Sequence, residues 1–269
     1  LQAARMAGQR IGLVPTMGNL HEGHLSLLRE ARQHCELLLA TIFVNPLQFG
    51  PNEDLERYPR TFDEDARLCA AEGVAFIFHP TPIYPKSGPK TMLKAIKLSD
   101  CLCGASRPGH FDGVVTVVNI LFNIVQPDIA IFGEKDWQQL AIIRRMVCDL
   151  QMPIEIVAYP TLRETDGLAK SSRNRYLSDG DRIVALAIST ALVAMQQLAV
   201  SGESNVEVLK AVATRILHNA GITPEYLDVR SASSLKMKRK LNRQPARAFI
   251  AAKLGTTRLI DNMPLELKT

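Results

Sequence analysis

Short apolar runs bounded by turn residues recur along the first part of the chain and are typical of buried strands. They cover residues 11–14, 37–44, 74–78, 128–132 and 154–158. Between them, apolar positions recur at helical spacing, which predicts helices over residues 23–34, 62–72, 114–125 and 138–150. Strands that alternate with helices predict a parallel sheet covered by helices, that is, an α/β fold.

The pattern changes after Pro160. Two amphipathic segments come first, and short strand-like runs follow them, which favours a smaller α+β domain. The predicted helices cover residues 178–198 and 205–220, and the predicted strands cover 226–229, 248–252 and 257–260. We therefore expect a larger domain over residues 1–161 and a smaller one over 162–269. Four prolines between Pro80 and Pro89 exclude a helix or a central strand there and predict a surface loop.

Composition is that of a globular protein, with 46% hydrophobic and 22% charged residues among 269. Apolar runs such as residues 36–44 are too short to span a bilayer, and no signal-peptide pattern opens the chain. We therefore expect no membrane partner and a cytoplasmic location. The net charge of +5 does not indicate nucleic acid as a partner, and it is equally consistent with an enzyme for anionic substrates. Five cysteines without a CxxC pair favour reduced thiols.

Two histidines lie where the first predicted strand turns into a helix. The segment runs from Pro15 to His24, and His21 and His24 are three residues apart, which places them on one helical face. A helix N-terminus offers free N–H groups and a positive dipole end, so it suits phosphate. Gly18 and Gly23 let the backbone approach a ligand closely. The segment therefore predicts nucleotide chemistry on a triphosphate.

Other interpretations of this pair are possible. A single histidine here would more often cap the helix or pack in the core. Zinc is disfavoured because helical zinc pairs are more often four residues apart and no third ligand is evident nearby. Two histidines, two glycines and a strand end together favour the functional interpretation.

The second motif follows the second predicted strand, which ends in a turn that presents Asn45 and Gln48. Neutral amides suit recognition of hydroxyl and carboxylate groups. An Asn-Pro turn with a solvated glutamine fits equally well, and this segment alone does not decide between them. The charged residues that follow, including Glu53, predict a solvated face.

The third motif, Gly133 to Gln139, again follows a strand. Lys135 can neutralise phosphate as a point charge, and Asp136 could hold magnesium directly or through water. An ordinary helix start capped by Asp136 is the alternative. A lysine in a first helical turn opposes the helix dipole, which favours a functional role.

Three further segments are less decisive. The polar loop 166–174 could close over phosphates, although alone it is more typical of a linker before a helix cap at Ser178. Arg107 could meet a carboxylate or phosphate of a substrate. The run 236–247 holds six lysines and arginines without interleaved aromatics, and a solvated turn between strands explains it better than a nucleic-acid patch.

Five collinear motifs together resemble those of the pantothenate synthetase (pantoate–β-alanine ligase) family within the HxGH nucleotidyltransferases. Residues 15–24 resemble its PTMGxLHxGH signature. The segments 42–50, 107–111, 133–139 and 166–174 resemble its FVNPxQFG, RPxHF, GEKDxQQ and DGLAxSSRN motifs. Any one would be weak evidence, and the set is specific.

The resemblance implies a Rossmann-like nucleotidyltransferase domain, a smaller C-terminal domain and a homodimer. It implies that pantoate attacks ATP in the presence of Mg²⁺ to give pantoyl adenylate and pyrophosphate, and that β-alanine then gives pantothenate and AMP. The catalytic residues would be His21, His24 and Lys135. The remaining implied ATP-binding residues are Met17, Gly18, Gly23, Gly133, Asp136, Ser171, Ser172 and Arg173. Pantoate would be held by Gln48 and Gln139, with Met17 and Phe43 on its apolar side, and Asp136 would lie near magnesium.

Two positions depart from the family pattern. Lys170 stands where an apolar residue usually precedes the serine pair, and the added cation bears on nucleotide affinity. Cys103 stands where a glutamate usually precedes the Arg107 segment, which would leave Arg107 without that partner.

Two other functions remain as alternatives. A plain nucleotidyltransferase would share the fold, but Gln48 and Gln139 favour a small polar acid as substrate. A binding module without catalysis would use residues 236–247, and the intact set of motifs argues against it.

Overall fold

The computed structural model describes residues 1–51 and 53–267. They form two compact units. Unit 1 consists of Leu1–Glu134 and Gln138–Pro160, and unit 2 consists of Lys135–Trp137 and the chain from Thr161 onward. We propose that these units are the two domains expected from the sequence.

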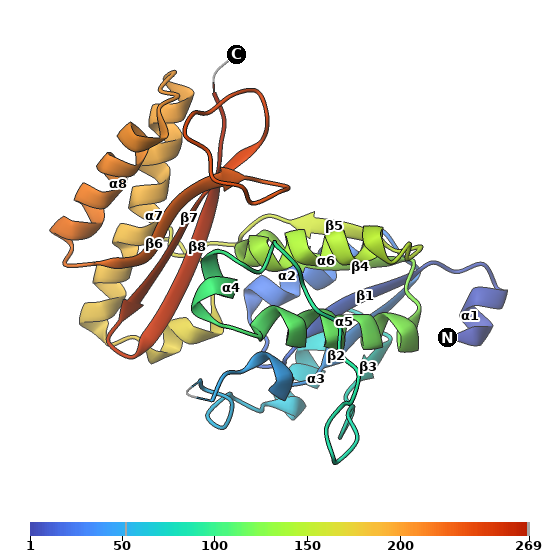
Figure 1. Cartoon of the computed structure of the whole chain (residues 1–269). Coiled ribbons are helices and arrows are strands. Elements are labelled where there is room, and N and C mark those ends of the chain that lie inside the picture. The colour runs from blue at the N-terminus through green and yellow to red at the C-terminus, as the bar shows by residue number, and fades with distance from the viewer. Residues whose placement is uncertain (52, 268–269) are drawn as a thin grey trace. The chain divides into compact units, whose positions relative to one another are not determined.

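Unit 1 is built on a five-stranded parallel sheet (Figure 1). Its strands are β1 (Ile11–Thr16), β2 (Leu37–Ile42), β3 (Phe76–Phe78), β4 (Ile129–Gly133) and β5 (Glu155–Tyr159). The spatial order is β3-β2-β1-β4-β5. From β1 the chain adds β2 and β3 toward one edge of the sheet, and β4 and β5 extend the sheet toward the other edge. In parallel sheets of this kind, ligands bind at the carboxyl ends of the strands where the order reverses. The loops after β1, β2 and β4 carry three of the sequence motifs.

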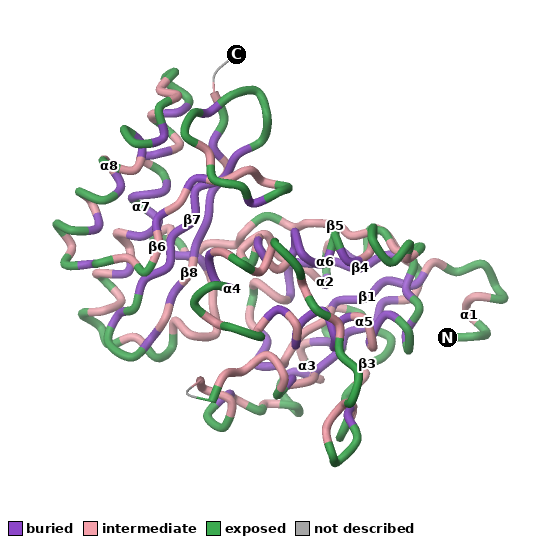
Figure 2. Tube along the Cα trace, viewed as in Figure 1, coloured by how far each residue is buried: buried purple, intermediate pink, exposed green. Residues whose placement is uncertain are grey.

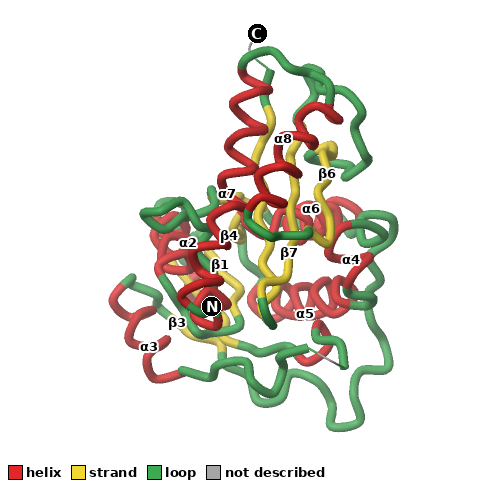
Figure 3. The backbone as a smooth tube through the Cα atoms, turned by 90° about the vertical axis from the view of Figure 1, so that its left-hand side faces the viewer, coloured by secondary structure: helices red, strands yellow, loops and turns green. Residues whose placement is uncertain are grey.

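Helices cover both faces of this sheet. The helices in this part of the chain are α1 (Gln2–Met6), α2 (Glu22–Arg32), α3 (Phe62–Ala71), α4 (Leu102–Ser106), α5 (His110–Val125) and α6 (Trp137–Asp149), with 3-10 turns η1 (Pro46–Gln48) and η2 (Glu134–Asp136). Figure 3 shows α2 and α3 on one side of the strands and α5 and α6 on the other. Leu25 and Leu28 of α2 pack on Val14 and Ile131 of the sheet. Figure 2 shows β1 and β4 as buried strands, as expected for the centre of such a sheet.

Unit 2 is a three-stranded antiparallel sheet with two long helices. Its elements are η3 (Ser172–Tyr176), α7 (Asp179–Val200), α8 (Val206–Asn219), β6 (Pro224–Ser231), β7 (Ala246–Leu254) and β8 (Thr257–Leu265). Strand β7 lies between β6 and β8. Its core joins residues such as Leu192, Leu209 and Ile250 from both helices and the sheet.

Helix α7 has 22 residues and, by length and composition, is apolar enough to cross a membrane. The sequence analysis, which found only short apolar runs, missed this. Within unit 2, however, Ile188, Leu192 and Met195 are almost fully buried in the hydrophobic core. We therefore interpret α7 as a core helix.

The predicted fold class is confirmed, and the differences lie at element ends and in two short helices. Helix α5 begins at His110, before the predicted start at residue 114, because Gly109 takes a left-handed conformation (φ 82°) at its N-cap. The short helices α1 and α4 were not predicted, since each has only five residues and shows no period. Residues 80–89 contain no helix or strand, as predicted.

The basic run divides between a loop and a strand. Most of it lies in the connection between β6 and β7, as predicted. Arg247, however, belongs to β7 and is only 5% exposed. Its guanidinium lies 3.8 Å from the ring centroid of Trp137, so this residue is not part of a solvated turn.

Candidate active site

The two histidines close the N-terminus of α2 by a reciprocal hydrogen-bonded cap. His21 is the N-cap residue, and its Nδ1 accepts the N–H of Gly23 at 3.1 Å. The Nδ1 of His24 accepts the N–H of His21 at 3.3 Å. Side-chain acceptors of this kind satisfy the N–H groups that the first helical turn leaves without backbone partners. The capping role weighed from the sequence is therefore present.

This cap also determines which ring nitrogens can donate. A neutral imidazole carries one hydrogen, and a nitrogen that accepts a hydrogen bond does not carry it. Because Nδ1 is the acceptor in both His21 and His24, each neutral ring carries its hydrogen on Nε2. The ring centroids are 4.1 Å apart. Capping and anion binding are thus compatible, since they use opposite nitrogens of the same rings.

A buried carboxylate holds the turn that leads into this cap. Asp65 of α3 is 1% exposed, and its two oxygens accept the N–H groups of Asn19 at 2.9 Å and Leu20 at 2.7 Å. Gly18 and Asn19 both have positive φ angles, 82° and 52°. A Cβ on Gly18 would approach an Asp65 oxygen to 2.9 Å, so glycine is required for both conformation and space. Asp65 was not predicted, because it lies on a different helix.

The ends of β1 and β2 bring the proposed pantoate residues of these two strands together. Thr16 and Ile42 are register partners, so Met17 and Phe43 follow directly after neighbouring strands. Gln48 donates from Nε2 to the Sδ of Met17 at 2.9 Å. A polar amide and two apolar side chains therefore lie at one edge of the sheet. Gln48 is held there by its neighbours and is not a freely solvated side chain.

Asn45 is the buried centre of this region. It is 1% exposed, and its Nδ2 donates to Gln48 Oε1 and to the Gly113 carbonyl, both at 3.1 Å. Its Oδ1 accepts the Tyr84 hydroxyl at 2.8 Å. The Tyr84 ring also meets Phe43 edge-on, with centroids 5.9 Å apart. Burial raises the pKa of Tyr84 to about 12, so its hydroxyl stays protonated and donates.

Arg107 binds a carboxylate of the chain itself. Its Nε donates to Glu53 Oε1 at 2.7 Å and its Nη2 to Glu53 Oε2 at 2.5 Å. Nη2 also donates to the Gln48 carbonyl at 3.2 Å. Glu53 was predicted to be on a solvated face, and that prediction is wrong. It supplies a carboxylate partner for Arg107, so Cys103 does not leave this arginine without one.

Burial alone would raise the pKa of Glu53, but the hydrogen bond and charge of Arg107 outweigh it and hold that pKa below its ordinary value. The carboxylate is therefore ionised at neutral pH. It forms a charge-assisted, two-point pair with the guanidinium, and the pair fixes Arg107 beside the main chain of Gln48.

At the end of β4, neighbouring glutamines have different environments. Gln138 is 5% exposed; its Oε1 accepts the Cys103 N–H at 3.0 Å, and its Nε2 donates to the Leu98 and Cys101 carbonyls, each at 2.8 Å. Gln139 is half-buried in the first turn of α6. Gly133 is the last residue of β4. Gln138 thus has a structural role, and the pantoate role of Gln139 stays a prediction.

In unit 2, the segment Lys135–Trp137 presents the predicted cation. The Lys135 side chain is 20% exposed, and its Nζ lies 3.9 Å from Oδ1 of Asp136, whose side chain is 49% exposed. The Asn262 amide donates to the Lys135 carbonyl at 2.9 Å. The Trp137 indole donates to the Ala232 carbonyl at 2.7 Å. The main chain of this segment is therefore fixed, and the lysine side chain is partly exposed.

The loop with Ser171, Ser172 and Arg173 also lies in unit 2. Ser171 caps η3, since its Oγ accepts the Arg173 N–H at 3.3 Å. Asn174 donates to the Ala169 carbonyl at 3.1 Å and to Glu164 at 2.9 Å. The loop is thus an ordered turn, and it leads to Ser178, which caps α7 as the sequence predicted.

Charges along the start of this loop are paired. Leu168 donates its N–H to Asp166 at 3.2 Å, and Arg182 donates to the same carboxylate at 2.6 Å. The backbone donor first, and then the arginine, hold the pKa of Asp166 below its ordinary value. The backbone N–H of Lys170 donates to the Leu162 carbonyl at 2.9 Å, which fixes the main chain at this position.

Within residues 1–51 and 53–267, no group of three or more His, Cys, Asp or Glu side chains could hold a metal ion. The cysteines in these ranges are not joined in disulfides. A structural zinc site needs four such ligands. The described residues do not supply that many ligands around the histidine pair.

Comparisons with known proteins agree with these motifs. The model of the Pantoate-beta-alanine ligase family matches residues 1–264. The chain is 51% identical over 267 residues to pantothenate synthetase 1 of Bradyrhizobium diazoefficiens, covering 98% of this chain and 94% of that protein. It is 48% identical over 268 residues to the pantothenate synthetase of Marinobacter nauticus, covering 98% and 95%.

Solved structures agree as well. A pantothenate synthetase structure from Thermus thermophilus is 43% identical with a TM-score of 0.91, covering 94% of this chain and 92% of that one. A pantoate-beta-alanine ligase from Francisella tularensis, complexed with beta-gamma ATP and beta-alanine, is 36% identical with a TM-score of 0.78 and coverages of 95% and 90%. The fold, the five motifs and these relatives agree, and the chain therefore belongs to the Pantoate-beta-alanine ligase family.

Proposed function

We propose that the residues above carry out the ligase reaction of this family in two steps. A carboxylate oxygen of pantoate attacks the α-phosphorus of ATP, the bond to the bridging oxygen breaks, and pyrophosphate leaves. The amine of β-alanine then attacks the carbonyl of pantoyl adenylate, loses a proton, and expels AMP. The observation that carries this proposal is the histidine cap, which leaves Nε2 as the hydrogen-bearing nitrogen of two adjacent rings.

The first step brings an anionic carboxylate to an anionic phosphate, so charge neutralisation and positioning supply most of the catalysis. His21 and His24 would donate to phosphate oxygens at the N-terminus of α2, where the helix dipole is also favourable. Met17, Gly18 and Gly23 would form the backbone against which the nucleotide lies. This mechanism needs no protein nucleophile.

Pantoate carries a carboxylate, two hydroxyls and an apolar body. We assign its polar groups to Gln48 and Gln139 and its apolar side to Met17 and Phe43. The contact between Gln48 and Met17 supports this assignment, because it holds an amide and an apolar side chain together at the end of β1. Phe43 is supported by Tyr84.

The remaining ATP contacts are assigned to Gly133 at the end of β4 and to unit 2. Lys135 would act as a point charge on phosphate. Ser171, Ser172 and Arg173 would add hydroxyl and guanidinium donors, and exclusion of water would protect the acyl adenylate from hydrolysis. The ordered loop and the partly exposed Lys135 side chain support these roles.

Among the residues assigned to ATP, one carboxylate is suited to bind magnesium. The ion usually binds through one or two carboxylates together with substrate phosphates and water. Asp136, with its half-exposed carboxylate beside Lys135, is suited to such a site. Asp136 would hold the ion, which when bound neutralises phosphate charge.

We also propose that the chain works as a homodimer, as the family resemblance implies, and that it works in the cytoplasm, as its reduced thiols indicate. Light scattering after gel filtration tests the assembly. A mass near twice the 29.7 kDa of one chain supports it, and a mass of one chain rejects it.

Oxygen labelling tests the reaction path. Pantoate labelled with ¹⁸O in its carboxylate should transfer one labelled oxygen to AMP, because the attacking oxygen stays on phosphorus when the amide forms. AMP release should require both pantoate and β-alanine, whereas pyrophosphate release should occur with pantoate and ATP alone. The second labelled oxygen stays in the amide of pantothenate, and AMP that carries no label would exclude the adenylate.

A further inference from the structure

The segment Lys135–Trp137 follows β4 along the chain and includes the first residue of α6, but its hydrogen bonds join it to Asn262 and Ala232 of unit 2. Asn262 of β8 donates from Nδ2 to the Lys135 carbonyl at 2.9 Å. The indole of Trp137 donates to the Ala232 carbonyl, and Arg247 of β7 stacks on its ring. The main chain of the proposed phosphate-binding lysine is thus held by residues about a hundred positions later.

Asn262 is well placed to fix this main chain. It is 3% exposed, and its Oδ1 accepts the Nε of Arg247 at 2.7 Å while its Nδ2 serves Lys135. Both ends of the amide are therefore engaged in a buried setting, where hydrogen bonds are directional and costly to leave unmade. Arg247 is in turn fixed against Trp137, so three contacts converge on one short segment.

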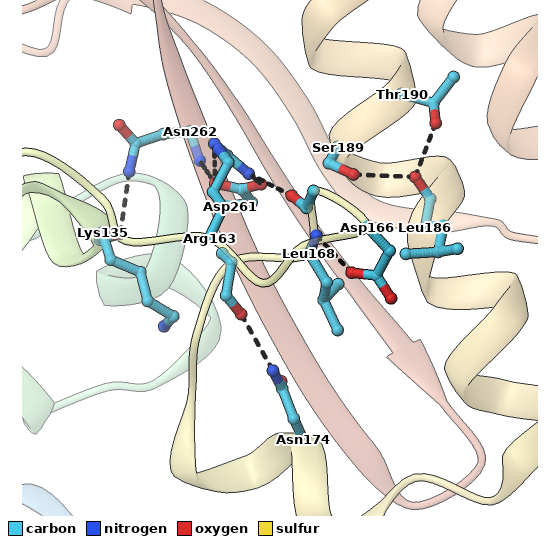
Figure 4. Close-up of polar contacts among 12 residues, drawn as sticks. Lys135, Arg163, Asp166, Leu168, Asn174, Leu186, Ser189, Thr190, Asp261 and Asn262 are labelled. Carbon is cyan, nitrogen blue, oxygen red and sulfur yellow. Dashed lines mark hydrogen bonds and ion pairs between the residues drawn. The ribbon is translucent and has the colours of Figure 1, made fainter. Parts of the chain in front are cut away.

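The same strand continues this network toward the loop with Ser171. The N–H of Asn262 donates to its neighbour Asp261 at 2.7 Å. Asp261, 4% exposed, binds Arg163 through both oxygens, at 2.7 and 3.1 Å. Arg163 also donates to the Gly167 carbonyl at 3.1 Å (Figure 4). Hydrogen bonds thus run without a break from Lys135 to the start of the loop.

We propose that Asn262 is a positioning residue for Lys135, and that Asp261 and Arg163 extend the same support to the loop of Ser171–Arg173. The phosphate-binding groups of unit 2 are then held as one block. This inference rests on the function proposed above, because it gives Asn262 a role only through Lys135. A lysine ammonium sits on a flexible four-carbon stem. A fixed main chain restricts the positions that the ammonium can reach, which lowers the entropy cost of placing it on the phosphate.

Asn262→Asp is the sharpest variant. It keeps the size of the side chain and an acceptor for Arg247, but it places an oxygen where the donor to the Lys135 carbonyl stood. We expect the kcat for pyrophosphate release from pantoate and ATP to fall about 10-fold, since small misplacements of catalytic groups have effects of this order or larger. The KM for pantoate should stay unchanged. Thr257→Val, a buried polar position on the same strand, is the matched control and should leave both constants unchanged.

A double-mutant cycle with Lys135→Ala separates positioning from a general structural role. If Asn262 acts through Lys135, Asn262→Asp should cause no further loss in the Lys135→Ala background. A full additional 10-fold loss there would overturn the inference. If Lys135→Ala alone leaves pyrophosphate release near normal, the proposed function of Lys135 fails instead, and the two failures are distinguishable.

Thermal unfolding of each variant accompanies the rates. If Asn262→Asp does not fold, Asn262→Ser replaces it, because serine is small and uncharged and lacks the reach to the Lys135 carbonyl. Loss of folding in both variants would overturn the inference, since Asn262 would then serve the fold of unit 2 and not the position of one lysine.

Discussion

The histidine cap of unit 1 and the Lys135 segment of unit 2 are each fixed by hydrogen bonds, but over different distances along the chain. In the cap, the donors and acceptors are two or three residues apart. At Lys135, the amide that holds the main chain is 127 residues away. The histidine cap can form together with helix α2, because its partners are neighbours in sequence. The Lys135 segment is fixed only when the sheet of unit 2 has formed. Mutations in β8 should therefore affect Lys135 while leaving the histidine cap intact.

The turn that leads into the cap also depends on a distant residue, because Asp65 accepts the N–H groups of Asn19 and Leu20. A mutation of Asp65 therefore tests whether the cap is local. Asp65→Asn replaces an oxygen that accepts a backbone N–H with an amide group that cannot. We expect the free energy of unfolding to fall by about 1–3 kcal/mol, the usual cost of a buried donor left without its acceptor. Adenylate formation should fall on the order of 10-fold or more, because the histidines shift with the turn.

Urea unfolding and pyrophosphate release measure these two effects. Thr61→Val is the matched control, since it removes a hydroxyl that donates to the same Asp65 oxygen at 3.1 Å but leaves both backbone contacts. Wild-type rates in Asp65→Asn would show that the turn does not depend on this carboxylate.

A smaller effect is expected at Tyr84, which supports the residues proposed for pantoate. Tyr84→Phe keeps the ring contact with Phe43 and removes the hydrogen bond to Asn45. One such bond contributes about 1 kcal/mol, which corresponds to roughly 5-fold in the KM for pantoate. The KM for ATP should not change. Steady-state kinetics with each substrate varied in turn checks this, and an equal change in both constants would reject a role specific to pantoate.

The smallest expected effect concerns the pair of Glu53 and Arg107. The pKa of Glu53 is lower in the folded protein than in the unfolded chain, so the pair stabilises the fold at pH values above the unfolded pKa. That contribution is lost as the pH falls through the lowered folded pKa. The difference in unfolding free energy between wild type and Glu53→Gln should be about 1 kcal/mol or less at pH 7. It should shrink on acidification, and a difference that grows would contradict the pairing.

The sequence was informative where a signal is local. The sequence predicted that Met17, His21 and Gln48 follow the ends of strands, and these residues do follow β1 and β2 in the parallel sheet. Turn glycines have a local signal as well, and Gly18 could be recognised from the sequence. The alternation of strands and helices was enough to predict the fold class, because each element carries its own period.

Long-range partners left no such signal. Asp65, Tyr84 and Asn262 act on residues 39 to 127 positions away, and only the folded chain brings them to their targets. Glu53 was assigned to a solvated face because charged neighbours surround it in sequence, although it pairs with Arg107. Its partner is 54 residues away, which no local pattern reveals.

The histidine cap also offers the most direct test of the proposed chemistry. His21→Asn keeps a side-chain acceptor that is well suited to an N-cap, so α2 should keep its start. It removes the Nε2 donor that we assign to phosphate. The measurement is the single-turnover rate of pyrophosphate release from pantoate and ATP. We predict a fall on the order of 100-fold with an unchanged melting temperature. A rate near that of the wild type would contradict the assignment of this histidine to ATP.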